Sequence, residues 1–363
     1  MTVSATTSSL LHPYCGAALQ LPNRIAMAPM TRGRANDCTG APHSFTSTYY
    51  ASRANAALIV TEGMYPAKAG KAGPGVPGLV SRAHIQAWRD VTASVHAAGG
   101  RVYAQLWHGG RVSHPLTIGE SGLPLAPSAV RTHGPVYTAG GWVDSVTPMA
   151  MTAGQIARTI DQFAEAARRA IEAGFDGVEL HGANGYLIQQ FLADNTNQRT
   201  DRYGGSVTRR VRFAVEVVEA VSAAIGAGRV GIRLSPGNPE NDIAEIDPPT
   251  TYQMLLRELD GLGLAYLHLV ETQHELALEY LRPLWSSMLI ANDHTSTRPT
   301  TQADGERLIG AGADIVAFGR AWLANPDLPE RFAEGLPLRF IPQEQYYGAG
   351  EAGFADLQSV VMP

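Results

Sequence analysis

The sequence contains little cysteine and little charge. Only 2 of its 363 residues are cysteine, and they form neither a disulfide framework nor a set with metal-binding spacing, so we expect no metal site. Charged residues make up 17% of the chain, below the roughly 25% usual for soluble domains. With 28 basic against 33 acidic residues the net charge is −5, which gives no electrostatic footprint for nucleic acid or an anionic membrane surface. We expect neither as a partner.

Long hydrophobic runs are also absent. No apolar stretch approaches the roughly 18 residues that indicate a membrane-spanning helix. The first residues, MTVSATTSSLLHPY, lack the basic and apolar regions of a secretory signal peptide, and the low cysteine content fits a reducing compartment. Hydrophobic residues nevertheless make up 45% of the chain, which is enough for a large core and excludes a disordered protein. These observations predict a cytoplasmic globular protein.

Motifs of several enzyme classes are missing. The chain has no phosphate-binding P-loop, no zinc motif and no G-x-S-x-G nucleophile turn. Residues 348–353 fit the G-x-G-x-x-G dinucleotide pattern, but no strand leads into them. The ten residues that follow are too few for the helix and second strand of a dinucleotide-binding unit. We expect this glycine-rich segment to be a flexible tail.

The chain instead repeats a short apolar run, a loop and a longer segment of helical period, as at residues 156–173 and 208–225. Runs that are nearly all apolar are typical of parallel strands buried on both faces. Eight such runs predict an α/β fold, a single (β/α)₈ TIM barrel, with a doubly wound open sheet as the alternative. The predicted strands are Ile25–Ala28, Leu58–Thr61, Val102–Leu106, Gly177–Leu180, Val230–Leu234, Tyr266–Val270, Met288–Ala291 and Ile315–Phe318.

The chain is longer than the roughly 250 residues of a typical barrel, and the excess lies in three segments. Residues 1–23 precede the first strand and are expected to form an N-terminal lid. Residues 107–150, rich in Gly, Pro, Ser and Thr, predict a capping segment after the third strand, with a hairpin in it. Residues 335–363 form a C-terminal tail. No linker or internal repeat divides the chain, so residues 1–363 are expected to form one domain.

In a (β/α)₈ barrel the chemistry lies where the strands end and the following loops begin. Taken singly, a polar residue at such a position is more often a packing or loop residue than a catalytic one. An active site is predicted because many such residues meet at one rim of the barrel. The candidates are Pro29, Met30, Thr31, Glu62, Gly63, Gln105, residues 181–186, Arg233, Ala291, Asn292, Gly319 and Arg320.

Several of these positions lie in longer blocks that resemble the Old Yellow Enzyme family of flavin-dependent reductases. The longest block is residues 177–206, GVELHGANGYLIQQFLADNTNQRTDRYGGS. The others are residues 28–31, 105–111, 231–236 and 318–327, so the resemblance covers nearly the whole chain in the family's order. The resemblance implies a (β/α)₈ barrel that carries non-covalent FMN. The charges in residues 196–206 are expected to pin a long loop rather than to carry chemistry.

The resemblance implies a flavin-contacting role for several rim residues. Thr31 corresponds to the residue whose hydroxyl reaches the flavin near C4=O and N5, and it places the chain in the branch of the family with threonine rather than cysteine there. Gln105 corresponds to the amide at the pyrimidine edge, and Arg233 to the cation near N1 and C2=O. The remaining implied FMN contacts are Pro29, Met30 and Gly63 along the ring, and Ala291, Asn292, Gly319 and Arg320 at the phosphate end.

One block departs from the family pattern. Relatives usually have a glycine-rich turn after the seventh strand, whereas this chain has Ala291–Asn292–Asp293–His294 followed by a longer polar stretch. A carboxylate aimed at a phosphate would be repelled. Asp293 is therefore expected to turn away, to pair with His294 or Arg298, or to weaken the phosphate site.

His181, Asn184 and Tyr186 resemble the family's substrate-binding and catalytic set. Two hydrogen-bond donors, His181 and Asn184, would hold a carbonyl or nitro oxygen, and Tyr186 would supply a proton. The implied activity is reduction of activated alkenes, with NADPH or NADH as reductant and a monomer or homodimer as the working form. The alternatives are a nitro or nitrate-ester reductase on the same flavin, a flavin-binding protein without turnover, and a barrel that binds no flavin.

Overall fold

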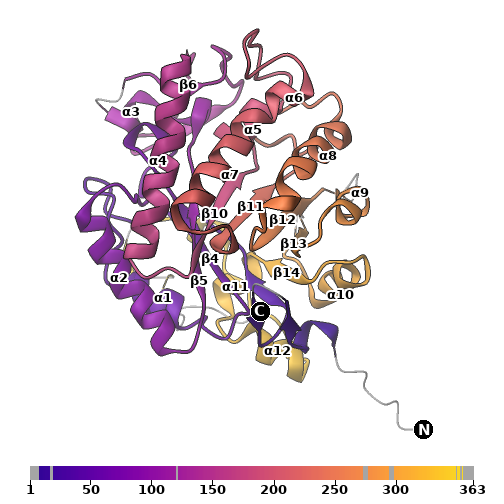
Figure 1. Cartoon of the computed structure of the whole chain (residues 1–363). Helices are drawn as coiled ribbons and strands as arrows, with labels where there is room; N and C mark the ends of the chain where they lie inside the picture. The colour runs from indigo at the N-terminus through magenta and orange to yellow at the C-terminus, as the bar shows by residue number, and fades with distance from the viewer. Residues whose placement is uncertain are drawn as a thin grey trace.

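A computed structural model describes residues 8–16, 19–119, 122–272, 277–293, 298–348, 350–351 and 354. Eight parallel strands close into a barrel, and helices surround it (Figure 1). The barrel prediction is confirmed and the open sheet is excluded, because β14 pairs with β3 and closes the ring. The barrel strands are β3 (Ile25–Met27), β4 (Ile59–Met64), β5 (Val102–Leu106), β10 (Gly177–Gly182), β11 (Val230–Leu234), β12 (Tyr266–Glu271), β13 (Met288–Asp293) and β14 (Ile315–Phe318).

The two predicted helical segments form helices. α4 begins with a capping box, in which the Thr152 hydroxyl accepts the backbone N–H of Gln155 and the Gln155 side chain accepts that of Thr152. The second segment is divided into α6 and α7 at Val211, which keeps helical backbone angles. The helices are α1 (Phe45–Ala51), α2 (Arg82–Ala97), α4 (Ala153–Glu172), α5 (Leu187–Leu192), α6 (Val207–Arg210), α7 (Arg212–Ile225), α8 (Pro248–Leu259), α9 (Ala277–Leu281), α10 (Gln302–Gly310), α11 (Arg320–Ala324) and α12 (Leu328–Glu334).

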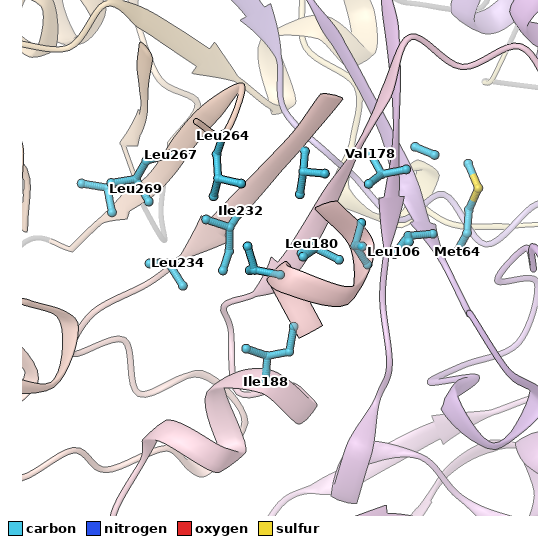
Figure 2. Close-up of a cluster of buried hydrophobic side chains, with 14 of the residues drawn as sticks. Met64, Leu106, Val178, Leu180, Ile188, Ile232, Leu234, Leu264, Leu267 and Leu269 are labelled. Carbon is cyan, nitrogen blue, oxygen red and sulfur yellow. The ribbon is translucent and has the colours of Figure 1, made fainter. Parts of the chain in front are cut away.

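Strand side chains alternate between the helices and the barrel interior. Val178 and Leu180 of β10 lie in the large buried cluster that also contains helix residues, together with Ile232 and Leu234 of β11 (Figure 2). Glu179, which lies between Val178 and Leu180 in the sequence, instead contacts side chains of other strands across the barrel interior. The two-residue period of a strand therefore makes one face of β10 apolar and the other polar.

The described part of residues 1–23 lies at the N-terminal end of the barrel. Strands β1 (Tyr14–Cys15) and β2 (Gln20–Leu21) form an antiparallel pair. Leu19 and Leu21 pack in one buried cluster with residues from the starts of the barrel strands, such as Leu58 and Met288. The bottom of the barrel is thereby closed by apolar side chains, at the end opposite to the predicted rim.

The capping segment contains the expected hairpin. Strand β7 (Pro135–Thr138) pairs antiparallel with β8 (Gly141–Asp144), while β6 (Leu125–Ala126) pairs with β9 (Met149–Ala150) and a short helix α3 spans Pro115–Ile118.

The loop at residues 196–206 is held by ion pairs and hydrogen bonds, as expected. The Arg199 guanidinium binds the Asp201 carboxylate and the carbonyls of Pro127 and Met151. Within the described ranges, no helix has both the length and the apolar character needed to cross a membrane.

Glycine at position 231 is required by the barrel interior. A Cβ built there would lie 2.3 Å from Cε2 of Tyr266, whose ring is fully buried. We expect Gly231→Ala to lower the free energy of unfolding by about 1–3 kcal/mol, the usual effect of overpacking a core. Gly261→Ala is the control, because a Cβ there has no atom within 4 Å. Equal urea-unfolding midpoints for the two variants would contradict this explanation.

Candidate active site

A cavity of about 320 Å³ opens where the barrel strands end, within the size range of small-molecule sites. It is lined by residues from the ends of β3, β5, β10, β11, β13 and β14, and from the C-terminal segment. Glu62, Gly182, Ala183 and Gly185, which were candidates only by their place on the rim, do not line it. Of the thirteen residues to which the resemblance gives a flavin or substrate role, all but two line this cavity. They are Pro29, Met30, Thr31, Gln105, His181, Asn184, Tyr186, Arg233, Asn292, Gly319 and Arg320.

The two exceptions are Gly63 and Ala291. A Cβ at Gly63 would lie 2.5 Å from Cε3 of Trp107, so the glycine makes room for the Trp107 ring, and that ring lines the cavity. Ala291 is fully buried in the cluster that contains helix residues. The seventh strand was predicted to end at Ala291, but β13 continues through Asn292 to Asp293, which pairs with Glu271 of β12. Ala291 and Asn292 are therefore both part of the strand.

Asp293 lines the cavity and has a partner that we did not expect. Its carboxylate lies 3.4 Å from Nη2 of Arg307, and its carbonyl accepts the Thr300 hydroxyl at 3.3 Å. Arg298 lines the cavity and binds Asp304, with Nη2 2.9 Å from Oδ1. Arg320 Nη1 donates to the Arg298 carbonyl at 3.2 Å. The proposed pairing with His294 lies outside the described residues.

Polar side chains fill the barrel interior directly beneath the cavity. Gln105 Nε2 donates to Glu179 Oε1 at 2.8 Å, and His268 Nδ1 lies 2.8 Å from Glu179 Oε2. Arg233 Nη2 donates to Asn292 Oδ1 at 2.8 Å, and the Asn292 amide donates to the Ala317 carbonyl at 2.9 Å. Sequence reasoning missed Glu179 and His268. The sequence did offer a signal for Glu179, because it is a charged residue in an otherwise apolar run and lies two positions before His181.

Three rings form one wall of the cavity. The Trp107 centroid lies 4.7 Å from that of Tyr186 in an edge-on arrangement, and the His181 centroid lies 5.2 Å from that of Tyr186. Burial, together with the nearby Arg233 cation, lowers the pKa of His181 well below its ordinary value, so this imidazole is neutral at pH 7. Burial also raises the pKa of the Tyr186 hydroxyl, which therefore stays protonated. The sequence gives Trp107 no role of its own, because it is one of the residues of the block 105–111.

Asn184 sits in a left-handed turn with φ 54°, a conformation that asparagine tolerates better than most residues. Its backbone N–H donates to Ser235 Oγ at 2.8 Å, and its carbonyl accepts the Asn241 amide at 2.7 Å. Its side-chain Oδ1 accepts from Asn238 Nδ2 at 3.3 Å. This bond orients the amide so that Nδ2 is the group left to bind a ligand.

The loop that supplies these partners is fixed from two sides. Arg111 Nη2 in the capping segment donates to the carbonyls of Asn241 and Asp242, at 3.0 and 2.7 Å. Gln189 Oε1 accepts the Gly185 N–H at 2.8 Å, and its Nε2 donates to the Ser235 carbonyl at 3.0 Å. Residues distant in the sequence therefore set the geometry of the turn at 184–186.

The described part of the C-terminal tail is docked on the barrel, which corrects the prediction of a flexible tail. Arg32 Nε donates to the Tyr346 carbonyl at 3.0 Å, and Arg34 Nη1 donates to the Gly350 carbonyl at 2.7 Å. Tyr346 and Tyr347 both line the cavity. The arginines explain the docking, because they follow directly on the Thr31 loop and bind carbonyls that a glycine-rich segment leaves unpaired.

The chain is similar in sequence to known flavin enzymes. Residues 9–339 match the NADH:flavin oxidoreductase / NADH oxidase family. The flavin oxidoreductase hxnT of Emericella nidulans is 38% identical, with 96% of each chain aligned. A protein of Leishmania infantum named "Probable flavin mononucleotide-dependent alkene reductase" is 37% identical, over 97% of this chain and 98% of its own.

Solved structures agree with the sequence comparison. The old yellow enzyme homologue from Zymomonas mobilis has a TM-score of 0.92 and 36% identity, covering 97% of this chain and 100% of its own. Morphinone reductase in complex with tetrahydroNAD has a TM-score of 0.90 and 39% identity, covering 96% of this chain and 97% of its own. This chain belongs to the NADH:flavin oxidoreductase / NADH oxidase family, as a member of its Old Yellow Enzyme group, and is an FMN-dependent NAD(P)H oxidoreductase.

Proposed function

We propose that the protein is an ene-reductase that uses NADPH or NADH to reduce α,β-unsaturated carbonyl compounds and nitroalkenes. The observation that carries the proposal is that two neutral hydrogen-bond donors, His181 and Asn184, and one protonated hydroxyl, Tyr186, line the same cavity as Gln105 and Arg233. The alkene reductase of Leishmania and morphinone reductase with tetrahydroNAD support the substrate class and the reductant.

Unpaired polar atoms in the cavity fit FMN. Arg233 is 6% exposed, and among the described residues its Nε has no hydrogen-bond partner. A buried donor of this kind costs about 1–3 kcal/mol unless a ligand satisfies it. Arg233, Gln105 and Thr31 would hold the flavin ring, whose charge increases on reduction. The other proposed contacts are Pro29, Met30 and Gly63 along the ring, and Ala291, Asn292, Gly319 and Arg320 at the phosphate.

FMN bound in this cavity would supply hydride transfer from a reduced nicotinamide to the substrate. The chain's own part is to hold the substrate oxygen and to move a proton. His181 and Asn184 would bind the carbonyl or nitro oxygen and stabilise the negative charge that develops there as hydride reaches the β-carbon. The neutral state of His181 suits this, because an imidazole N–H donates without an additional buried charge.

Tyr186 would protonate the α-carbon. A general acid must carry its proton at the working pH, and burial raises the pKa of this hydroxyl further above neutrality. The Trp107 ring packs edge-on against Tyr186 at 4.7 Å and fixes the ring's direction. Because nitro groups also present oxygens to the same two donors, nitroalkenes are substrates of the same site.

The first test of this proposal is the cofactor and its anchor. Purified protein should be yellow and release FMN on heating. Arg233→Met should weaken FMN binding at least about tenfold, because a charged hydrogen bond contributes about 1.5–3 kcal/mol. Arg257→Met, at an exposed position on α8, is the control. Fluorescence titration of apoprotein measures both constants. FAD, covalent flavin, or equal affinity in the two variants would contradict the assignment.

The second test concerns the substrate oxygen. The double variant His181→Ala, Asn184→Ala should lose alkene reduction and bind phenol-type ligands weakly, while FMN content stays at the wild-type level. Each lost hydrogen bond should cost about 2.7–4 kcal/mol in the transition state. His96→Ala, at an exposed position on α2, should behave as wild type. Near-normal enone turnover in the double variant would show that the substrate binds elsewhere.

The third test separates hydride transfer from proton transfer. Tyr186→Phe removes one hydroxyl and leaves the ring, so reduction of the flavin by nicotinamide should keep its rate. Reoxidation by an enone should slow about 10²–10⁴-fold, the usual contribution of a positioned acid. Nitroalkenes are the internal control, since their hydride adduct is a nitronate that leaves without a proton.

Stopped-flow absorbance follows both half-reactions of this variant. Equal slowing with enones and nitroalkenes, or a collapse of the nicotinamide step, would remove Tyr186 from its assigned role.

A further inference from the structure

The pair Glu179–His268 lies at the centre of the barrel interior, below the active-site cavity. Both side chains are 0% exposed. They come from strands that are not neighbours, because β11, which carries Arg233, lies between β10 and β12. In register, Glu179 is opposite Gly231, and Arg233 is opposite both His181 and His268. The glycine makes room for the ring of Tyr266, which a Cβ at position 231 would meet at 2.3 Å.

Both carboxylate oxygens of Glu179 are occupied. Oε1 accepts Gln105 Nε2 at 2.8 Å, and Oε2 lies 2.8 Å from His268 Nδ1. Burial alone would raise the pKa of the Glu179 carboxyl, but His268, Arg233 and the Gln105 amide together hold it below its usual range. Burial lowers the pKa of His268 despite the carboxylate. Glu179 is therefore an anion, and His268 serves it as a neutral donor.

Water does not screen this charge. Below the carboxylate lies the apolar cluster in which the buried rings of Tyr103 and Tyr266 pack together with Leu19 and Leu21. Above it lie Gln105 and Arg233, which line the cavity. In such a low-dielectric setting a full charge acts on its neighbours several-fold more strongly than it would at the surface.

We propose that Glu179, held by His268, is a positioning residue that orients the Gln105 amide and opposes the Arg233 cation, and thereby lowers the reduction potential of the bound flavin. The proposal rests on the roles proposed above for Gln105 and Arg233. Because Gln105 Nε2 is bound to Glu179, its Oε1 acceptor and its second N–H are left for a ligand. A carboxylate beneath the flavin disfavours the charge that reduction adds, whereas Arg233 favours it.

Glu179→Gln removes the charge and keeps the shape. The new amide group has only one oxygen acceptor, whereas Glu179 offers one oxygen to Gln105 and one to His268. The Gln105 amide therefore loses its fixed orientation. Reduced FMN should then bind at least about tenfold more tightly relative to oxidised FMN than in the wild type. For a two-electron couple this corresponds to a midpoint potential about 30 mV more positive. The absorption band of oxidised FMN should shift as well, because its pyrimidine contacts change.

Glu271→Gln is the matched control. Glu271 is also a fully buried strand carboxylate, but its Oε1 accepts the backbone N–H of Leu278 in α9, and it does not line the cavity. This variant should leave the potential and the spectrum at wild-type values.

If the Glu179→Gln variant does not bind FMN, two substitutions at His268 test whether the buried carboxylate sets the reduction potential. His268→Asn keeps a donor near the position of Nδ1 and should retain the wild-type potential. His268→Leu removes the donor, so the carboxyl takes up a proton and the potential should rise, as in Glu179→Gln. Wild-type protein without FMN would contradict the proposed function itself. FMN-loaded His268→Leu and Glu179→Gln proteins with unchanged potential and spectrum would overturn the present inference and leave Glu179 a structural residue.

Discussion

Successive side chains of β10 point in opposite directions, and this alternation joins the hydrophobic core to the active site. Val178 and Leu180 pack outward among helix residues, while Glu179 and His181 point inward. A slip of one residue in the pairing of β10 would exchange the two sets. It would place a carboxylate and an imidazole among leucines and valines. The burial that stabilises the barrel therefore also sets the position of His181, to which we assign a catalytic role, and of Glu179.

A second consequence is that the interior is polar at one end and apolar at the other. The apolar end is closed by Leu19 and Leu21, and the polar end opens into the cavity. Within the described part of the chain, Arg233 Nε and His181 Nδ1 are buried without a partner. Unsatisfied donors and acceptors in a low-dielectric site are costly in free energy, and the cofactor and substrate that we propose for this cavity would relieve that cost.

The sequence predicts the barrel and most of the cavity for identifiable reasons. All eight strands are nearly all apolar, so their pattern can be detected locally in the sequence, and the rim residues lie at the strand ends or directly after them. The seventh strand was predicted to end two residues too early, at Ala291, because its length depends on the pairing of Asp293 with Glu271 of a neighbouring strand. Ser235, Asn238 and Asn241 were missed because they act on Asn184 through contacts between distant loops. The docked tail was missed because its partners, Arg32 and Arg34, lie more than 300 residues earlier.

The central claim is that one cavity holds both the flavin and the oxygen of the substrate. A crystal structure of the FMN-loaded protein with a bound phenolate tests it most directly. The account predicts a flavin ring in contact with Gln105, Arg233 and Thr31, and a phenolate oxygen within hydrogen-bond distance of His181 and Asn184. A phenolate oxygen that faces away from both residues, or a flavin outside this cavity, would contradict it.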